Sequence, residues 1–111
     1  MSTETTAIDN KRFKEIILSD LERFDFFDDI YENYLIPAGY RYVHTIPSKN
    51  SDQLLDELGI SLRILDNEAY KWSSELRNGA EIPKEKYDII LKYWEYLLFI
   101  SAERTASYWE R

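Results

Sequence analysis

The chain has no cysteine and a single histidine, His44, among its 111 residues. The absence of cysteine excludes disulfides, zinc–thiolate sites and cysteine nucleophiles. Histidine-paired catalysis would have to use His44, and no nucleophile-elbow glycine pattern accompanies the nearby Ser48 and Ser51. We therefore predict that the chain has no catalytic residues and is not an enzyme.

Glycine and long apolar runs are also scarce. Three isolated glycines cannot build a phosphate-binding loop, so nucleotide chemistry by the standard motifs is disfavoured. The longest apolar run, from Tyr96 to Ile100, is far shorter than the roughly 18 residues of a membrane span. The polar residues 1–7 contain no hydrophobic signal region. We expect a cytoplasmic protein with no membrane contact and no cofactor.

Basic residues are outnumbered by acidic ones, 14 to 21, which gives a formal net charge of −7. The basic residues occur in short groups mixed with acids, so no basic stripe is available for a phosphate backbone. Direct binding of nucleic acid is therefore disfavoured, whereas a partner with a basic surface would be attracted. Hydrophobic residues make up 44% of the chain, which is enough to favour a folded core over disorder.

The first segment with helical apolar spacing ends at about residue 35, before Pro37 and Gly39. Asp9 or Asn10 is its expected N-terminal cap, after a tail over residues 1–8 that we expect to be disordered. The segment is either one helix or two helices with a break near Asp25, because the phenylalanines around that position do not share one face.

The second predicted helix begins at a Ser51 cap and ends before Gly79. Gly59 either costs about 1 kcal/mol inside a continuous helix or marks a break after which Ser61 restarts the helix. The apolar stripe of this segment consists of Leu54, Leu58, Leu62, Leu65, Ala69, Trp72 and Leu76.

The third predicted helix begins near Pro83 and continues to the end of the chain. Between Ile89 and Ile100 it is apolar on almost every side, which predicts either a central position or a homodimer surface. The sequence therefore predicts an all-α bundle of three long helices, the first alternatively split into two. We expect residues 9–111 to form a single domain with one long loop near residues 37–50.

Carboxylates gather on the first predicted helix at spacings of three and four residues, which places them on one helix surface. Such a surface can bind a basic partner or imitate a row of phosphates, and the alternative is an ordinary solvated helix face. No metal is expected, because metal sites inside bundles use Glu-x-x-His pairs and this chain has none. The cluster consists of Asp25, Asp28, Asp29 and Glu32.

Tyr40, Arg41 and Tyr42 in the predicted loop are residue types that serve as binding anchors, because they bury large areas and keep a polar group. The alternative is a loop that is pinned to the bundle by its own tyrosines. Trp109 lies close to the chain end and is hard to bury, so we predict that it is an exposed anchor.

The sequence thus predicts a small acidic, non-enzymatic protein-interaction module of the inhibitor, immunity, adaptor or accessory-subunit type. It would bind and occlude a basic surface of a protein partner through its acidic helix and its aromatic anchors. The alternative hypothesis is a helical subunit of a nucleoprotein complex, or a DNA mimic that regulates a nucleic-acid-binding protein.

Overall fold

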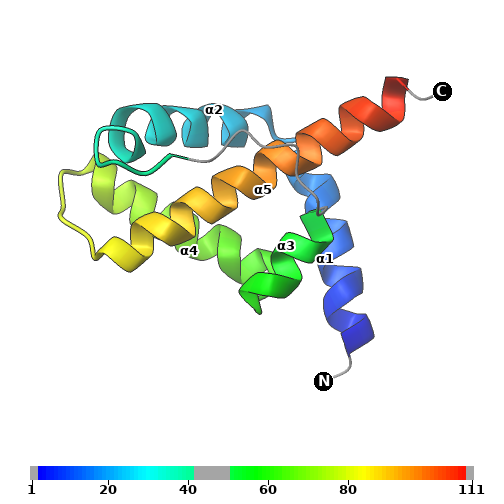
Figure 1. Cartoon of the computed structure of the whole chain (residues 1–111). Helices are drawn as coiled ribbons and strands as arrows, with labels where there is room; N and C mark the ends of the chain where they lie inside the picture. The colour runs from blue at the N-terminus through cyan, green and yellow to red at the C-terminus, as the bar shows by residue number, and fades with distance from the viewer. Residues whose placement is uncertain (1–2, 42–50, 110–111) are drawn as a thin grey trace.

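The computed structural model describes the backbone of residues 3–41 and 51–109, with side chains for residues 8–41 and 51–104. All the regular structure in these ranges is helical, which confirms the all-α prediction (Figure 1). The prediction of three long helices is corrected, because both the first and the second are broken. The elements are α1 (Thr3–Leu18), α2 (Leu21–Ile30), the π-helical turn η1 (Tyr31–Leu35), α3 (Ser51–Leu58), α4 (Leu62–Arg77) and α5 (Lys84–Trp109).

The first predicted helix is broken at Ser19 and Asp20, not near Asp25, which lies inside α2. The Asp20 side chain accepts a hydrogen bond from the backbone N–H of Arg23 at 3.3 Å and so caps the start of α2. An aspartate that bonds the backbone in this way competes with continuation of the preceding helix. The chain therefore turns before the phenylalanines, and a new helix carries them.

Helix α1 begins at Thr3, earlier than the predicted caps Asp9 and Asn10, so residues 3–8 of the expected tail are helical. Both predicted caps bond to α4 instead. Asn10 Oδ1 accepts from the backbone N–H of Leu62 at 3.0 Å, and Asp9 pairs with Arg63 at 3.2 Å.

The π-helical turn η1 follows α2 directly, and the sequence pattern did not predict it. The backbone N–H of Ile36 donates to the Tyr31 carbonyl at 3.0 Å, which is the i to i+5 bond of this geometry. The turn ends at Leu35, close to the expected stop signals. Gly39 follows with φ of +92°, and Tyr40 N–H donates to the Leu35 carbonyl at 2.9 Å.

The second predicted helix is broken at Gly59, which has φ of +70° and terminates α3. Ser61 then caps α4, because its Oγ accepts from the backbone N–H of Ile64 at 3.3 Å. Of the two alternatives for Gly59, the structure therefore contains the break. The apolar stripe survives the break, because Leu54 and Leu62 are both buried.

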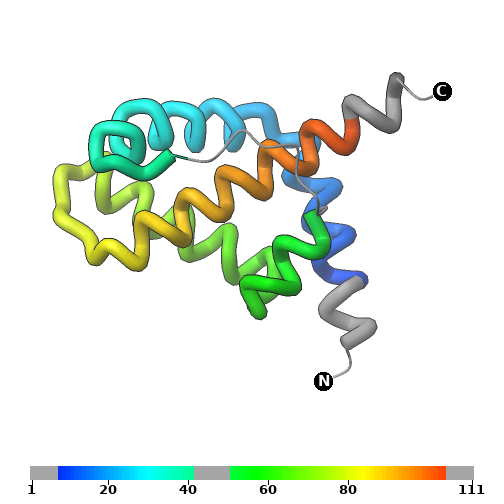
Figure 2. The backbone as a smooth tube through the Cα atoms, viewed as in Figure 1, coloured from blue at the N-terminus to red at the C-terminus, as the bar shows by residue number. Residues whose placement is uncertain are grey.

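Helix α5 is central, since it contacts α1, α2, η1, α3 and α4. Figure 2 shows it running between α2 on one side and α3 and α4 on the other. Tyr93, Leu97 and Ile100 have no exposed surface, in agreement with the prediction of a central helix. No helix in the described part of the chain is long and apolar enough to cross a membrane.

Candidate functional site

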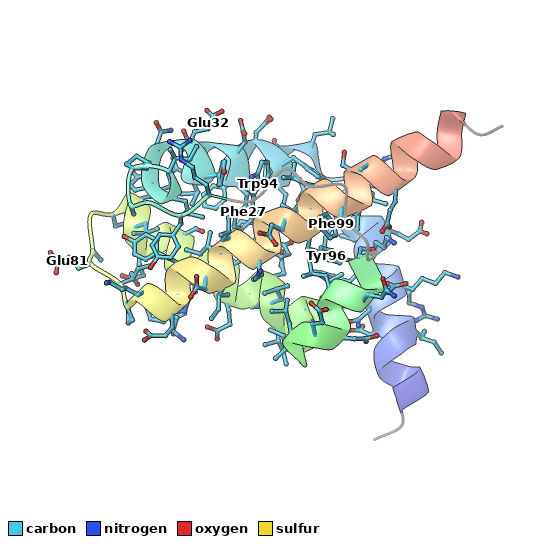
Figure 3. The ribbon with its side chains drawn as sticks, in the orientation of Figure 1. Phe27, Glu32, Glu81, Trp94, Tyr96 and Phe99 are labelled. Atoms are coloured by element: carbon cyan, nitrogen blue, oxygen red, sulfur yellow. The ribbon has the colours of Figure 1, made fainter. Side chains whose placement is uncertain are left out.

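The predicted acidic residues form one exposed face on α2 and η1. Asp25, Asp28, Asp29 and Glu32 are all exposed, and we call them the acidic face. The inward side of the same helix carries Phe27, which is fully buried. Figure 3 shows Glu32 on the outer side of this helix, away from the labelled core rings. The helix geometry therefore separates the carboxylates from the core.

No described basic side chain neutralises the acidic face. Asp29 Oδ1 accepts from Asn33 Nδ2 at 2.7 Å, which is an uncharged partner. Among the described side chains, no lysine or arginine forms an ion pair with any of the four carboxylates. Residues 21–35 contain five acids and one base, a net charge of −4 out of −7.

That one base, Arg23, is turned inward. Its side chain is 11% exposed and lies between two carboxylates, 3.4 Å from Asp20 and 3.3 Å from Asp66 on α4. Its guanidinium carbon also lies 5.6 Å from the ring centres of Phe13 and Tyr70. Arg23 therefore holds α2 against α1 and α4, and it does not screen the acidic face.

Asp66 is the centre of a buried polar network that joins three helices. Its Oδ1 accepts a hydrogen bond from the hydroxyl of Tyr93 on α5 and faces the Nε of Arg23. Nε and Nη1 of Arg23 form no hydrogen bond among the described residues, so the contact between Arg23 Nε and Asp66 is an attraction between charges. We call Arg23, Asp66 and Tyr93 the buried network.

Burial controls the proton affinities of this network. Burial raises the pKa of Asp66 above its ordinary value, although the Tyr93 hydrogen bond and the Arg23 charge oppose the rise. Burial, together with the neighbouring Asp66 charge, also raises the pKa of Tyr93, so this tyrosine stays protonated as the donor. The network is therefore a fixed donor–acceptor arrangement that positions α2 relative to α4 and α5.

Aromatic rings add to this anchoring. Phe26 stacks on Tyr70 of α4 with ring centres 5.2 Å apart. The Phe27 ring forms T-shaped pairs with Tyr70 and with Tyr93, with ring centres 4.8 Å and 4.9 Å apart. Such pairs fix ring geometry and contribute beyond the buried area. The acidic face is thus presented on a helix whose opposite side is tightly packed.

The predicted loop anchors have different surroundings. Tyr40 is half-buried and stacks on Tyr87 of α5, with ring centres 4.9 Å apart and planes 10° from parallel. Arg41 is exposed, and Tyr42 lies outside the described residues. The backbone of Trp109 ends α5, but its side chain is outside the described part. Tyr40 therefore fixes the chain after η1 to the start of α5.

The buried network was not predicted from the sequence. The detectable signal was Asp66, which follows Leu62 by four residues and precedes Ala69 by three, so it falls on the apolar side of α4. A carboxylate at such a position requires an internal partner. The sequence could not identify Arg23 or Tyr93 as those partners, because both are distant along the chain.

No group of three or more potential metal ligands occurs in the described part of the chain. His44 lies outside the described residues. No known protein family, curated protein or solved structure matches this chain.

Proposed function

We propose that this chain is a small, non-enzymatic protein-interaction module whose acidic face binds and occludes a basic surface of a protein partner. The observation that carries the proposal is the exposed row of Asp25, Asp28, Asp29 and Glu32, which forms no ion pair with a described side chain and lies on a firmly anchored helix. The module would be of the inhibitor, immunity, adaptor or accessory-subunit type.

The acidic face is energetically unfavourable for the free protein. Asp25 and Glu32 each lie three residues from one of the two central aspartates, Asp28 and Asp29, and four residues from the other. Each like-charge pair at these spacings destabilises a helix by about 0.2–0.5 kcal/mol. A basic partner would remove this repulsion, and its long-range attraction to the face would accelerate association.

An apolar residue adjoins the acidic face. Leu21 begins α2, precedes Asp25 by one helical turn and is 73% exposed. Apolar contact supplies affinity while charge supplies orientation, as in other protein interfaces. The proposed binding surface therefore combines the acidic face with Leu21. Tyr40, Arg41, Tyr42 and Trp109 belong to the same proposal as additional anchors.

The test compares two variants with the same change in charge. One replaces the acidic face (Asp25→Asn, Asp28→Asn, Asp29→Asn, Glu32→Gln), and the other replaces four exposed acids elsewhere (Asp56→Asn, Glu75→Gln, Glu81→Gln, Asp88→Asn). Each tagged protein is sized by light scattering and used to capture partners from a lysate of the source cell. Captured proteins are identified by mass spectrometry, and their affinity is then measured at several salt concentrations.

We expect the acidic-face variant to lose the stoichiometric partner and the control variant to keep it. Wild-type affinity should fall with salt, and the acidic-face variant should show a weaker salt dependence. The acidic-face variant should also be at least as stable as wild type, which excludes loss of folding as the cause. Equal partner binding and equal salt dependence in both variants would contradict the proposal. A dimer seen by light scattering would instead assign part of the surface to self-association.

Displacement by DNA and treatment with nuclease distinguish the alternative functions from the proposed one. The spaced carboxylates of α2 could also imitate a phosphate row, in which case the captured partner is a nucleic-acid-binding protein that DNA displaces. A partner that survives nuclease supports a direct protein contact. Loss of all partners after nuclease treatment would indicate a subunit of a nucleoprotein complex.

A further inference from the structure

Helix α3 is held at its start by a side chain from the far end of the chain. The Ser51 backbone N–H donates to Glu103 Oε1 at 2.8 Å, and the Ser51 hydroxyl donates to Glu103 Oε2 at 2.9 Å. Lys14 on α1 completes the contact, with Nζ 3.3 Å from Glu103 Oε2 and 3.4 Å from Ser51 Oγ. We call this arrangement the Glu103 clasp.

The clasp does the work that a capping residue does within a single helix. Ser51 is almost completely buried, so its N–H and hydroxyl need partners inside the protein. Burial alone would raise the pKa of Glu103, but the hydrogen bonds from Ser51 and the Lys14 charge outweigh it and lower that pKa. The ionised carboxylate is therefore the form that holds α3.

Helix α3 has little to stabilise it on its own. It contains eight residues, and isolated helices shorter than about 12 residues are marginal in water. Its buried leucines, Leu54 and Leu55, pack into the shared core, and α5 is its main neighbour among the described elements. Figure 3 shows Tyr96 and Phe99 on the part of α5 beside α3. Its apolar side and the clasp therefore both attach this short helix to α5.

The other end of α3 is a glycine turn. Gly59 has φ of +70°, and Ile60 beside it is exposed. Helix α4 begins independently with its own Ser61 cap and its cross-helix bond from Leu62 to Asn10. The start of α4 is therefore held by contacts that do not involve α3, and movement of α3 can be absorbed at Gly59.

We propose that α3 opens as a separate unit while the rest of the bundle stays folded, and that the Glu103 clasp controls this opening. Opening uncovers the side of α5 that carries Tyr96, which is buried in the closed protein. Local opening of this kind is expected for a short element that packs mainly on one neighbour, as α3 packs on α5. The device is separate from the acidic face and does not depend on the proposed function.

Native-state hydrogen exchange by NMR tests the proposal on the full chain. The amides of residues 55–59 report on α3, and those of residues 69–73 report on α4, after correction for intrinsic exchange rates. In wild type, we expect α3 to exchange faster than α4 and with a smaller dependence on urea. Equal exchange and equal urea dependence in the two helices would overturn the proposal.

The Glu103→Gln variant tests the role of the clasp, and Glu95→Gln is its matched control. Glu95 lies on the same helix and pairs with Lys92 at 3.5 Å, away from the clasp. We expect E103Q to accelerate exchange in α3 about tenfold, the effect of losing a strong helix cap, without changing α4. E95Q should leave the ratio of the exchange rates of α3 and α4 unchanged.

A second variant keeps the test informative if E103Q folds poorly. Ser51→Ala removes the two hydrogen bonds of the Ser51 hydroxyl, with Glu103 and with Lys14, and leaves the bond from the backbone N–H to Glu103. We expect a smaller acceleration that is again confined to α3. If neither variant changes the exchange of α3 relative to α4, the clasp does not control the opening and this part of the proposal fails.

Discussion

Asn10 on α1 caps α4 across the bundle, because its Oδ1 accepts a hydrogen bond from the backbone N–H of Leu62 at 3.0 Å. Leu62 is the first residue of α4, where backbone N–H groups have no partner within the helix. Ser61 satisfies the N–H of Ile64 at the same end. One helix start is therefore shared between a local cap and a side chain from a distant helix.

Replacing Asn10 by alanine should destabilise the protein. Loss of a capping side chain costs about 1 kcal/mol, although alanine recovers a few tenths through its higher helix propensity. Asn67→Ala is the control, because Asn67 is exposed within α4 and reports only the propensity gain. Urea unfolding should place N10A about 1 kcal/mol below N67A. Equal stabilities would show that the bond between Asn10 and Leu62 contributes nothing.

Replacing Tyr93 by phenylalanine should weaken the buried network. The ring and its contact with Phe27 would remain, but the Asp66 carboxylate would lose its hydroxyl donor in a buried position. A buried acceptor that is left without its partner costs about 1–3 kcal/mol. The measurement is the free energy of unfolding in urea.

Tyr87→Phe is the matched control for that variant. Tyr87 also lies on α5, and its ring stacks on Tyr40, but its hydroxyl takes no part in the buried network. We expect a change below about 0.5 kcal/mol for this variant. The importance of the Asp66 hydrogen bond would be disproved by an equal loss of stability in the two variants.

Acid should weaken the Glu103 clasp. Because the pKa of Glu103 is lower in the folded protein than in the unfolded chain, its ionised form stabilises the fold. This contribution is complete above about pH 5 and is lost as the pH falls through the ordinary glutamate value of about 4.3 to the lower folded value. The charged or titratable groups around it are Lys14, Asp52 and Tyr96.

The measurement is the difference in unfolding free energy between wild type and E103Q as a function of pH. We expect a constant difference near neutral pH that shrinks below about pH 5. Other carboxylates, including Asp66 with its raised pKa, titrate in both proteins and cancel in the difference. A difference that stays constant down to about pH 3 would mean that the Glu103 charge does not stabilise the fold.

The sequence predicted those parts of the fold that depend on local pattern. The all-α class, the end of the first predicted helical segment before Pro37 and Gly39, and the start of α5 near Pro83 all follow from helical spacing and stop signals. The exposed position of the acidic residues also follows, because helical spacing separates them from Phe27. These features need no knowledge of distant contacts.

The remaining features depend on contacts between distant residues. Asp9 and Asn10 have the composition of a local cap, but their partners are Arg63 and Leu62 on another helix. Arg23 could not be assigned to Asp66 from spacing, because any of the exposed acids of α2 was an equally good partner in sequence. Tertiary packing decides between such partners, and a single sequence does not contain that information.

Replacing Gly59 by alanine should distinguish a glycine that ends α3 from one that merely weakens a continuous helix. In a continuous helix, alanine would stabilise the protein by about 1 kcal/mol. At the observed φ of +70°, alanine should destabilise it by about 1–2 kcal/mol, because its Cβ disfavours the left-handed conformation. No described atom lies within 4 Å of the added Cβ, so the cost arises from the backbone alone. Gly59→Asn should cost less than alanine, because asparagine tolerates this conformation better. The sign of the change in urea unfolding for G59A therefore decides between the two structures of this segment.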